Sequence, residues 1–143
     1  MRIVRTTLLT IWFVALSLAA RADIVVLPDP DKWIETALED ITNGKTDDFA
    51  RNYLTLIGKP ELFDSLAGNV RILSTLGAPA FMEKVSDEKY GTAVREVVYL
   101  ALYRQTDYMY FRFVIKKNRG GWAITNFSFK SEPGETFPAG FRR

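Results

Sequence analysis

The 143-residue sequence contains no cysteine and no histidine. Without a thiol, the chain can form no disulfide, carry no lipid-modified cysteine and perform no thiol redox chemistry. Without an imidazole, Ser-His-Asp and Cys-His catalysis is excluded, and so are the common zinc and copper sites. No glycine-rich phosphate loop and no calcium-loop spacing is present either. We therefore predict no cofactor and no metal, and a fold that is stabilised by side-chain packing.

Long apolar runs are also missing. The longest run, at 8–20, has 13 residues, whereas about 20 are needed to cross a bilayer. It follows Arg2 and Arg5 and precedes the small residues of Ala20-Arg21-Ala22, which is the pattern of a secretory signal peptide. We predict a signal peptide at 1–22 that is cleaved, with an uncleaved anchor as the alternative. The mature chain would then be exported, to a Gram-negative periplasm or out of the cell, and would span no membrane.

The predicted mature chain has almost no net charge. The signal carries three basic residues and no acid, so the 19 basic and 17 acidic residues of the full sequence become 16 and 17. Acids are in excess in 23–79 and bases in 80–143, but no stripe of lysine and arginine indicates a nucleic-acid partner. The uneven charge could attract an acidic partner to the second half, although two faces of one domain that differ in charge explain it more simply.

Helical patterns fill the first half of the mature chain, and strand patterns fill the second. Helix caps and Gly or Pro breaks predict helices at 30–42, at 46–57 and from 60 toward 76, with Gly68-Asn69 as a point where the third could split. Aromatic and β-branched residues predict strands at about 81–86, 92–104, 107–117 and 121–131. We predict a single α+β domain at 23–131, with about three helices on an antiparallel four-stranded meander, and a loosely ordered tail at 132–143.

The lengths of the hairpin loops predict which side chains share a face of this sheet. A two-residue loop at 105–106 would put Val98, Leu100 and Leu102 on the core face. A three-residue loop at 118–120 would add Phe127 and Phe129 to the same face and place Ile124 on the other. The opposite face would then carry a set of candidate binding residues: Tyr99, Tyr108, Tyr110, Arg112, Asn126 and Ser128.

An arginine among tyrosine and amide groups can bind a carboxylate through two hydrogen bonds. Tyrosine and arginine are also enriched at the hot spots of protein interfaces. We predict a non-catalytic module that uses this face to form a homodimer or to bind another envelope protein. An ordinary solvated sheet face is the alternative.

The capped helices, the Gly58-Lys59-Pro60 break and a last strand that reads GWAITNF at 121–127 resemble the nuclear transport factor 2-like superfamily, in its small secreted or periplasmic members. The resemblance covers about 29–131 and implies a strongly bent sheet that wraps the helices into a cone. Proteins of this fold include enzymes, carriers and dimerising adaptors, so the fold alone selects no function.

The resemblance also implies an alternative function inside the cone. Members that resemble ketosteroid isomerase use a carboxylate base and a tyrosine there, and this sequence offers only Glu96, Asp107, Asp64 and Tyr53 for such roles. A carrier of a small apolar ligand, or such an enzyme, would use a pocket between the sheet and the helices. The residues expected to line it are Trp33, Phe49, Tyr53, Phe111 and Phe127.

Overall fold

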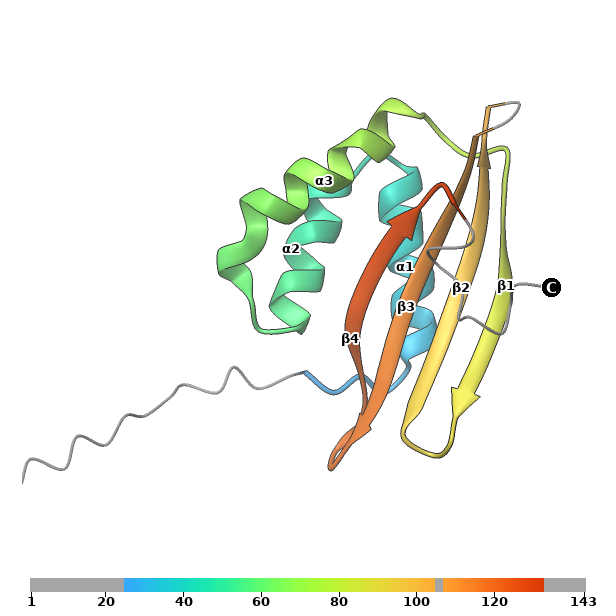
Figure 1. Cartoon of the computed structure of the whole chain (residues 1–143). Coiled ribbons are helices and arrows are strands. Elements are labelled where there is room, and N and C mark those ends of the chain that lie inside the picture. Colours follow the sequence, from blue (N-terminus) through green and yellow to red (C-terminus); the bar gives the residue numbers. More distant parts are fainter. Residues whose placement is uncertain (1–24, 105–106, 133–143) are drawn as a thin grey trace, which may run out of the picture.

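The structure is a computed structural model that describes residues 25–104 and 107–132. The predicted signal peptide and nearly all of the predicted tail lie outside the described residues. Within them, three α-helices pack on one face of a single four-stranded antiparallel sheet (Figure 1). The predicted α+β class is confirmed.

The three helices lie close to the predicted ranges, although the third begins at Phe63 and not at residue 60. They are α1 (Pro30–Thr42), α2 (Thr46–Leu56) and α3 (Phe63–Thr75), the last preceded by the 3₁₀ turn η1 (Pro60–Leu62). The side chain of Asp29 caps α1 by accepting a 3.0 Å hydrogen bond from the backbone N–H of Lys32. Helix α3 continues through Gly68, so the possible split does not occur.

The strands follow one another in the sheet as a simple meander. They are β1 (Phe81–Tyr90), β2 (Val94–Tyr103), β3 (Asp107–Asn118) and β4 (Gly121–Lys130), in the order β1-β2-β3-β4. Strand β1 is longer than the predicted 81–86, since residues 87–90 also pair with β2. The meander leaves β1 and β4 as the two edges of the sheet.

The predicted pairing of β2 with β3 was wrong by one residue. Tyr103 lies opposite Asp107, so the loop has three residues, and Arg104 belongs to the loop with a left-handed φ of 53°. Successive side chains of a strand point to opposite faces, so a shift of one residue moves every β2 side chain to the other face. Tyr99 consequently lies opposite Phe111.

The observed pairing of β3 with β4 also differs from the predicted pairing, but most side chains of β4 keep the predicted face. The loop has two residues instead of three, and a β-bulge at Thr125 separates the pair Val114–Asn126 from the pair Ile115–Ile124. Phe127 and Phe129 face the core as predicted. Ile124, predicted on the opposite face, is fully buried in the core, because the bulge shifts the alternation of β4 by one residue.

Candidate functional site

The sheet has a second face that no described helix covers (Figure 1). We call it the outer face. The cross-strand pairs place the following side chains on it: Phe81, Glu83, Ser86, Glu88 and Tyr90 of β1; Val94, Glu96, Val98, Leu100 and Leu102 of β2; Tyr108, Tyr110, Arg112, Val114 and Lys116 of β3; and Asn126, Ser128 and Lys130 of β4.

Five of the six predicted binding residues lie on the outer face, and Tyr99 does not. Arg112 lies opposite Ser128 and Val114 opposite Asn126, with Tyr108 and Tyr110 on the same face. Tyr99 is 8% exposed and belongs to the core cluster on the other face. Its inclusion in the binding set was therefore wrong, because the observed pairing of β2 with β3 differs from the predicted pairing by one residue.

Val98 lies opposite Arg112, where Tyr99 was predicted, and Glu96 lies two residues away on the same strand and face. The guanidinium Nη2 of Arg112 donates a hydrogen bond to Oε2 of Glu96, whose side chain is 6% exposed. The other carboxylate oxygen, Oε1, is buried and has no hydrogen-bond partner among the described residues. A correct count of the hairpin loop would have found this pair, because it would have put Glu96 on the face of Arg112.

Exposed aromatic side chains lie at both ends of the outer face. Phe81 is 41% exposed, Tyr108 is 45% exposed, and both lie beside Leu102, so they form a row across β1, β2 and β3. Tyr90 is 47% exposed and lies opposite Val94 at the other end. Such aromatic groups supply large contact areas at little cost in side-chain entropy, which suits an interface.

The two halves of the outer face differ in charge. The acidic side chains are on β1 and β2, whereas the basic side chains are on β3 and β4. The acids are Glu83, Glu88 and Glu96, and the bases are Arg112, Lys116 and Lys130. In a pair of copies related by a two-fold axis, the acidic half of each could face the basic half of the other.

The predicted interior pocket is a packed aromatic core. Its five predicted residues do come together: the ring centroids of Phe49 and Phe127 are 4.7 Å apart, those of Phe49 and Tyr53 are 6.0 Å apart, and those of Trp33 and Tyr53 are 6.4 Å apart. Phe49 and Phe111 are fully buried. The crevice beside Trp33 and Phe49 has a volume of about 20 Å³, which leaves no room for a ligand there.

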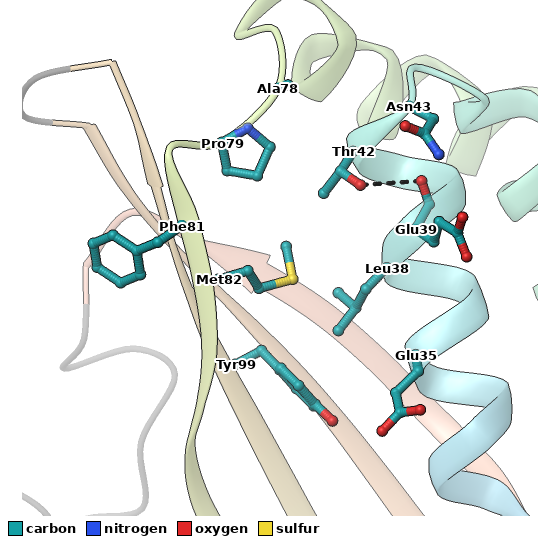
Figure 2. A pocket seen from close by; sticks show the side chains of 10 residues that line it. All are labelled: Glu35, Leu38, Glu39, Thr42, Asn43, Ala78, Pro79, Phe81, Met82 and Tyr99. Atoms are coloured by element: carbon teal, nitrogen blue, oxygen red, sulfur yellow. Dashed lines mark hydrogen bonds between the residues drawn. The ribbon is translucent and has the colours of Figure 1, made fainter.

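Open clefts lie at both edges of the sheet, lined by residues that the structure describes. One, of about 430 Å³, lies between α1 and the start of β1, where Leu38, Met82 and Tyr99 meet the carboxylates of Glu35 and Glu39 (Figure 2). The other, of about 540 Å³, lies between α3 and β4. Its apolar lining residues are Leu66, Ile72, Phe127 and Phe129.

An ion-pair network ties the start of α1 to β1 and β2. Arg95 lies 2.6 Å from Asp31 and 2.5 Å from Asp87, and Lys84 lies 3.3 Å from Asp31. The hydrogen bonds from Arg95 hold the pKa of both aspartates below the usual range. The side chain of Arg95 is 17% exposed, so we assign the network a structural role.

We expect this network to make stability depend on acid pH. A carboxylate with a lowered folded-state pKa stabilises the fold above its unfolded pKa of about 3.9, and this contribution is lost as pH falls through the folded pKa. Chemical unfolding at pH 7 and at pH 3 should therefore show a smaller difference for Asp31→Asn than for the unchanged chain. Glu61→Gln, at an exposed position of η1, is the matched control. An equal pH dependence of Asp31→Asn and the unchanged chain would contradict this role.

Two of the residues considered for catalysis, Tyr53 and Glu96, lie on opposite faces of the sheet. Tyr53 is in the core, and Glu96 is paired with Arg112 on the outer face. The side chain of Asp107 lies outside the described residues. Among the described residues, no group of three or more acidic side chains is placed to hold a metal ion, and no helix is long and apolar enough to cross a membrane.

We compared the chain with protein-family models, curated proteins and solved structures. No family model matches the sequence, and no curated protein matches it. The chain is similar to a structure described as a putative NTF2-like transpeptidase from Campylobacter jejuni, with a TM-score of 0.45 and 11% identity over 67% of this chain and 96% of that one. At this level of similarity nothing is inferred about activity, and the description of the fold rests on the elements and pairings given above.

Proposed function

We propose that this chain is an exported, non-catalytic binding module whose outer face docks a second copy of the same chain. One observation carries the proposal: a sheet face that no described helix covers presents Phe81, Tyr90 and Tyr108 with more than two fifths of each residue exposed. Exposed aromatic side chains that share one sheet face are of the kind that is enriched at protein interfaces.

The charge distribution supports a second copy as the partner. Because the acids lie on β1 and β2 and the bases on β3 and β4, a two-fold arrangement brings unlike charges together across the interface. Tyr108 at one end of the face and Tyr90 at the other would add apolar contacts with the second copy. Another envelope protein with the same charge pattern is the alternative partner.

We expect Tyr90→Ser combined with Tyr108→Ser to weaken self-association by at least about tenfold, since truncated interface hot spots cost about 2 kcal/mol or more. Both side chains are exposed, so the variant should remain folded. Sedimentation velocity over a range of protein concentrations would measure the change.

The control for this variant is Ile72→Ser, on α3, where the residue is 58% exposed and away from the outer face. It should leave self-association unchanged. If the two variants behaved alike, the outer face would not be the docking surface.

A carrier function is the second candidate, and the cleft between α1 and β1 is the observation that favours it. The cleft combines an apolar floor of Leu38 and Met82 with the two carboxylates of Glu35 and Glu39 (Figure 2). A ligand that fits would be apolar with a cationic group. Such a ligand would appear as added mass on a monomer in native mass spectrometry.

A further inference from the structure

The wall that α3 gives to the cleft between α3 and β4 has a glycine near its centre. Gly68 lies in the interior of the helix and lines the cleft. Glycine inside a helix is less favourable than alanine, because it loses more backbone freedom on folding. A Cβ atom built on Gly68 meets no described atom within 4 Å beyond its own helix, so no described neighbour requires a glycine here. The position leaves room for a group that approaches the backbone of α3.

The opposite wall is β4, which forms one edge of the sheet (Figure 1). At the start of this strand the edge is occupied, because the backbone N–H of Leu27 donates a 2.8 Å hydrogen bond to the carbonyl oxygen of Trp122. Ile124, close to this bridge, is fully buried, whereas Phe127 and Phe129 beside the cleft are only partly buried. The edge thus accepts an extended segment at one end, and among the described residues it has none at the other.

Backbone groups in the second half of β4 point toward this open side. Residues 126–130 pair regularly with β3, and in an antiparallel sheet the N–H and C=O groups of alternate residues point to the same edge. The hydroxyl of Tyr53 hydrogen-bonds to the backbone of Phe127, so the groups of Phe127 point away from β3, and those of Phe129 point the same way. No described backbone group pairs with Phe129 on this side. Such unpaired groups are a template for a further strand.

The other edge of the sheet, β1, is protected against such pairing. It carries five charged residues among ten and a bulge between Lys84 and Ser86. Charged side chains and bulges are features that keep natural edge strands from pairing with other chains. Residues 121–129 of β4 contain no charged residue, and the bulge at Thr125 precedes the part of the strand that lines the cleft. Of the two edges, β4 is therefore the one suited to a further strand.

We propose that the cleft between α3 and β4 binds an extended peptide segment of another protein, which adds a fifth strand beside β4. The peptide backbone pairs with Phe129, and every second peptide side chain enters the cleft, whose volume is about 540 Å³. Leu66, Ile72 and Phe127 offer apolar contacts there, so the side chains that enter are apolar. Gly68 gives a large one the space to reach α3.

A second copy of this chain does not fit the same place. In an antiparallel pair of β4 edges, the side chains directed toward the cleft would be Phe127 and Phe129 of the second copy, which pack against that copy's own helices and core. A free peptide carries no such helices. The site lies at an edge of the sheet and not on the outer face, so this inference does not rest on the proposed function.

Selection from a phage-displayed library of random dodecapeptides tests the site without knowledge of the partner. Peptides would be selected on the unchanged chain and counter-selected on Gly68→Trp, whose ring fills the cleft. This variant should fold, because the position is open and tryptophan favours a helix more than glycine does. We expect selected peptides with apolar residues at alternate positions, and a Kd for Gly68→Trp that is weaker by at least about tenfold.

The matched control is Ser74→Trp, which places the same ring at an exposed position of α3 outside the cleft. It should leave peptide binding unchanged. Pairing of the backbones has its own test, since N-methylation of alternate peptide amides removes the donors along one edge of the peptide. Methylation of the edge that faces β4 should weaken binding by at least about tenfold, and methylation of the other edge should not. Hydrogen exchange of the Phe129 amide should slow when the peptide binds.

Several results would overturn the inference. One is a library without any peptide that prefers the unchanged chain to Gly68→Trp. Another is equal binding of the peptides methylated on either edge, which would assign the cleft to a ligand held by its apolar groups alone. A third is a loss of self-association in Gly68→Trp, which would assign the edge to a second copy.

The peptide site and the docking surface fail separately. Tyr90→Ser with Tyr108→Ser should keep peptide binding, because neither residue lines the cleft. A chain that binds the peptide but forms no dimer would refute the proposed function and leave this inference standing. A chain that forms the dimer but selects no peptide would do the reverse.

Discussion

Phe49→Ala is expected to lower the free energy of unfolding by about 3–5 kcal/mol, the usual cost of removing a fully buried phenylalanine. Phe49 is fully buried and contacts the rings of Tyr53 and Phe127, with centroid distances of 6.0 Å and 4.7 Å. Its truncation removes these contacts and leaves a cavity where α2 meets β4. Since a domain of this size is stable by about 5–15 kcal/mol, the loss should be plain in a urea titration.

Phe81→Ala is the matched control, because the same ring is removed from a site that is 41% exposed. It should cost less than about 1 kcal/mol, as most surface substitutions do. Equal losses for the two variants would contradict the close-packed interior. A small loss for Phe49→Ala would revive the pocket predicted inside the cone.

Arg112→Met is expected to cost about 2–3 kcal/mol, somewhat less than the 3–5 kcal/mol typical of a broken buried ion pair. The side chain of Glu96 is 6% exposed and that of Arg112 is 31% exposed, so the substitution would leave a buried carboxylate without its cation. Methionine keeps most of the apolar stem of the arginine, so the loss reports mainly on the charge.

A double-mutant cycle isolates the interaction between these two side chains. In a Glu96→Gln background no carboxylate remains to be left unpaired, and Arg112→Met should then cost only about 1 kcal/mol. Equal costs in the two backgrounds would show that the pair contributes nothing. Because Arg112 supports the fold in this way, the exposed Tyr90 and Tyr108 are better positions for testing the docking surface.

The helices and the ends of most strands could be predicted because their signals are local. Asp29 and Pro30 start α1, and the Gly58-Lys59-Pro60 break separates α2 from η1, whatever the rest of the chain does. The core face of β3 could also be predicted, since Phe111, Phe113 and Ile115 alternate with polar residues over most of the strand. Such local patterns need no knowledge of the partner strand.

The face of each β2 side chain could not be predicted in this way. Residues 97–103 of β2 are apolar or aromatic on both faces, so the pattern itself does not favour either register. The predicted register depended on the length of the loop after Tyr103. One residue more or less in this loop moves every β2 side chain to the other face of the sheet. The bulge at Thr125 has no signal in the sequence, and it moved Ile124 into the core.

The candidate site was predicted in part for the same reason. The β3 and β4 members of the binding set were placed correctly because their side chains were assigned to the correct face. Tyr99 was placed on the wrong face, together with the other side chains of β2. Glu96 could be found beside Arg112 only after the loop length was known. The exposed Tyr90 was missed because this strand was predicted to end at Ser86, and Phe81 was missed because no pairing was predicted for the strand.

Docking through the outer face is tested most directly by sedimentation velocity of three chains at matched concentrations: the unchanged chain, the chain with Tyr90→Ser and Tyr108→Ser, and the control chain with Ile72→Ser. We expect a concentration-dependent dimer for the unchanged chain and for the control, and a loss of dimer in the tyrosine variant. A monomer at every concentration for all three chains, or a dimer that the tyrosine substitutions leave intact, would contradict docking of a second copy on this face.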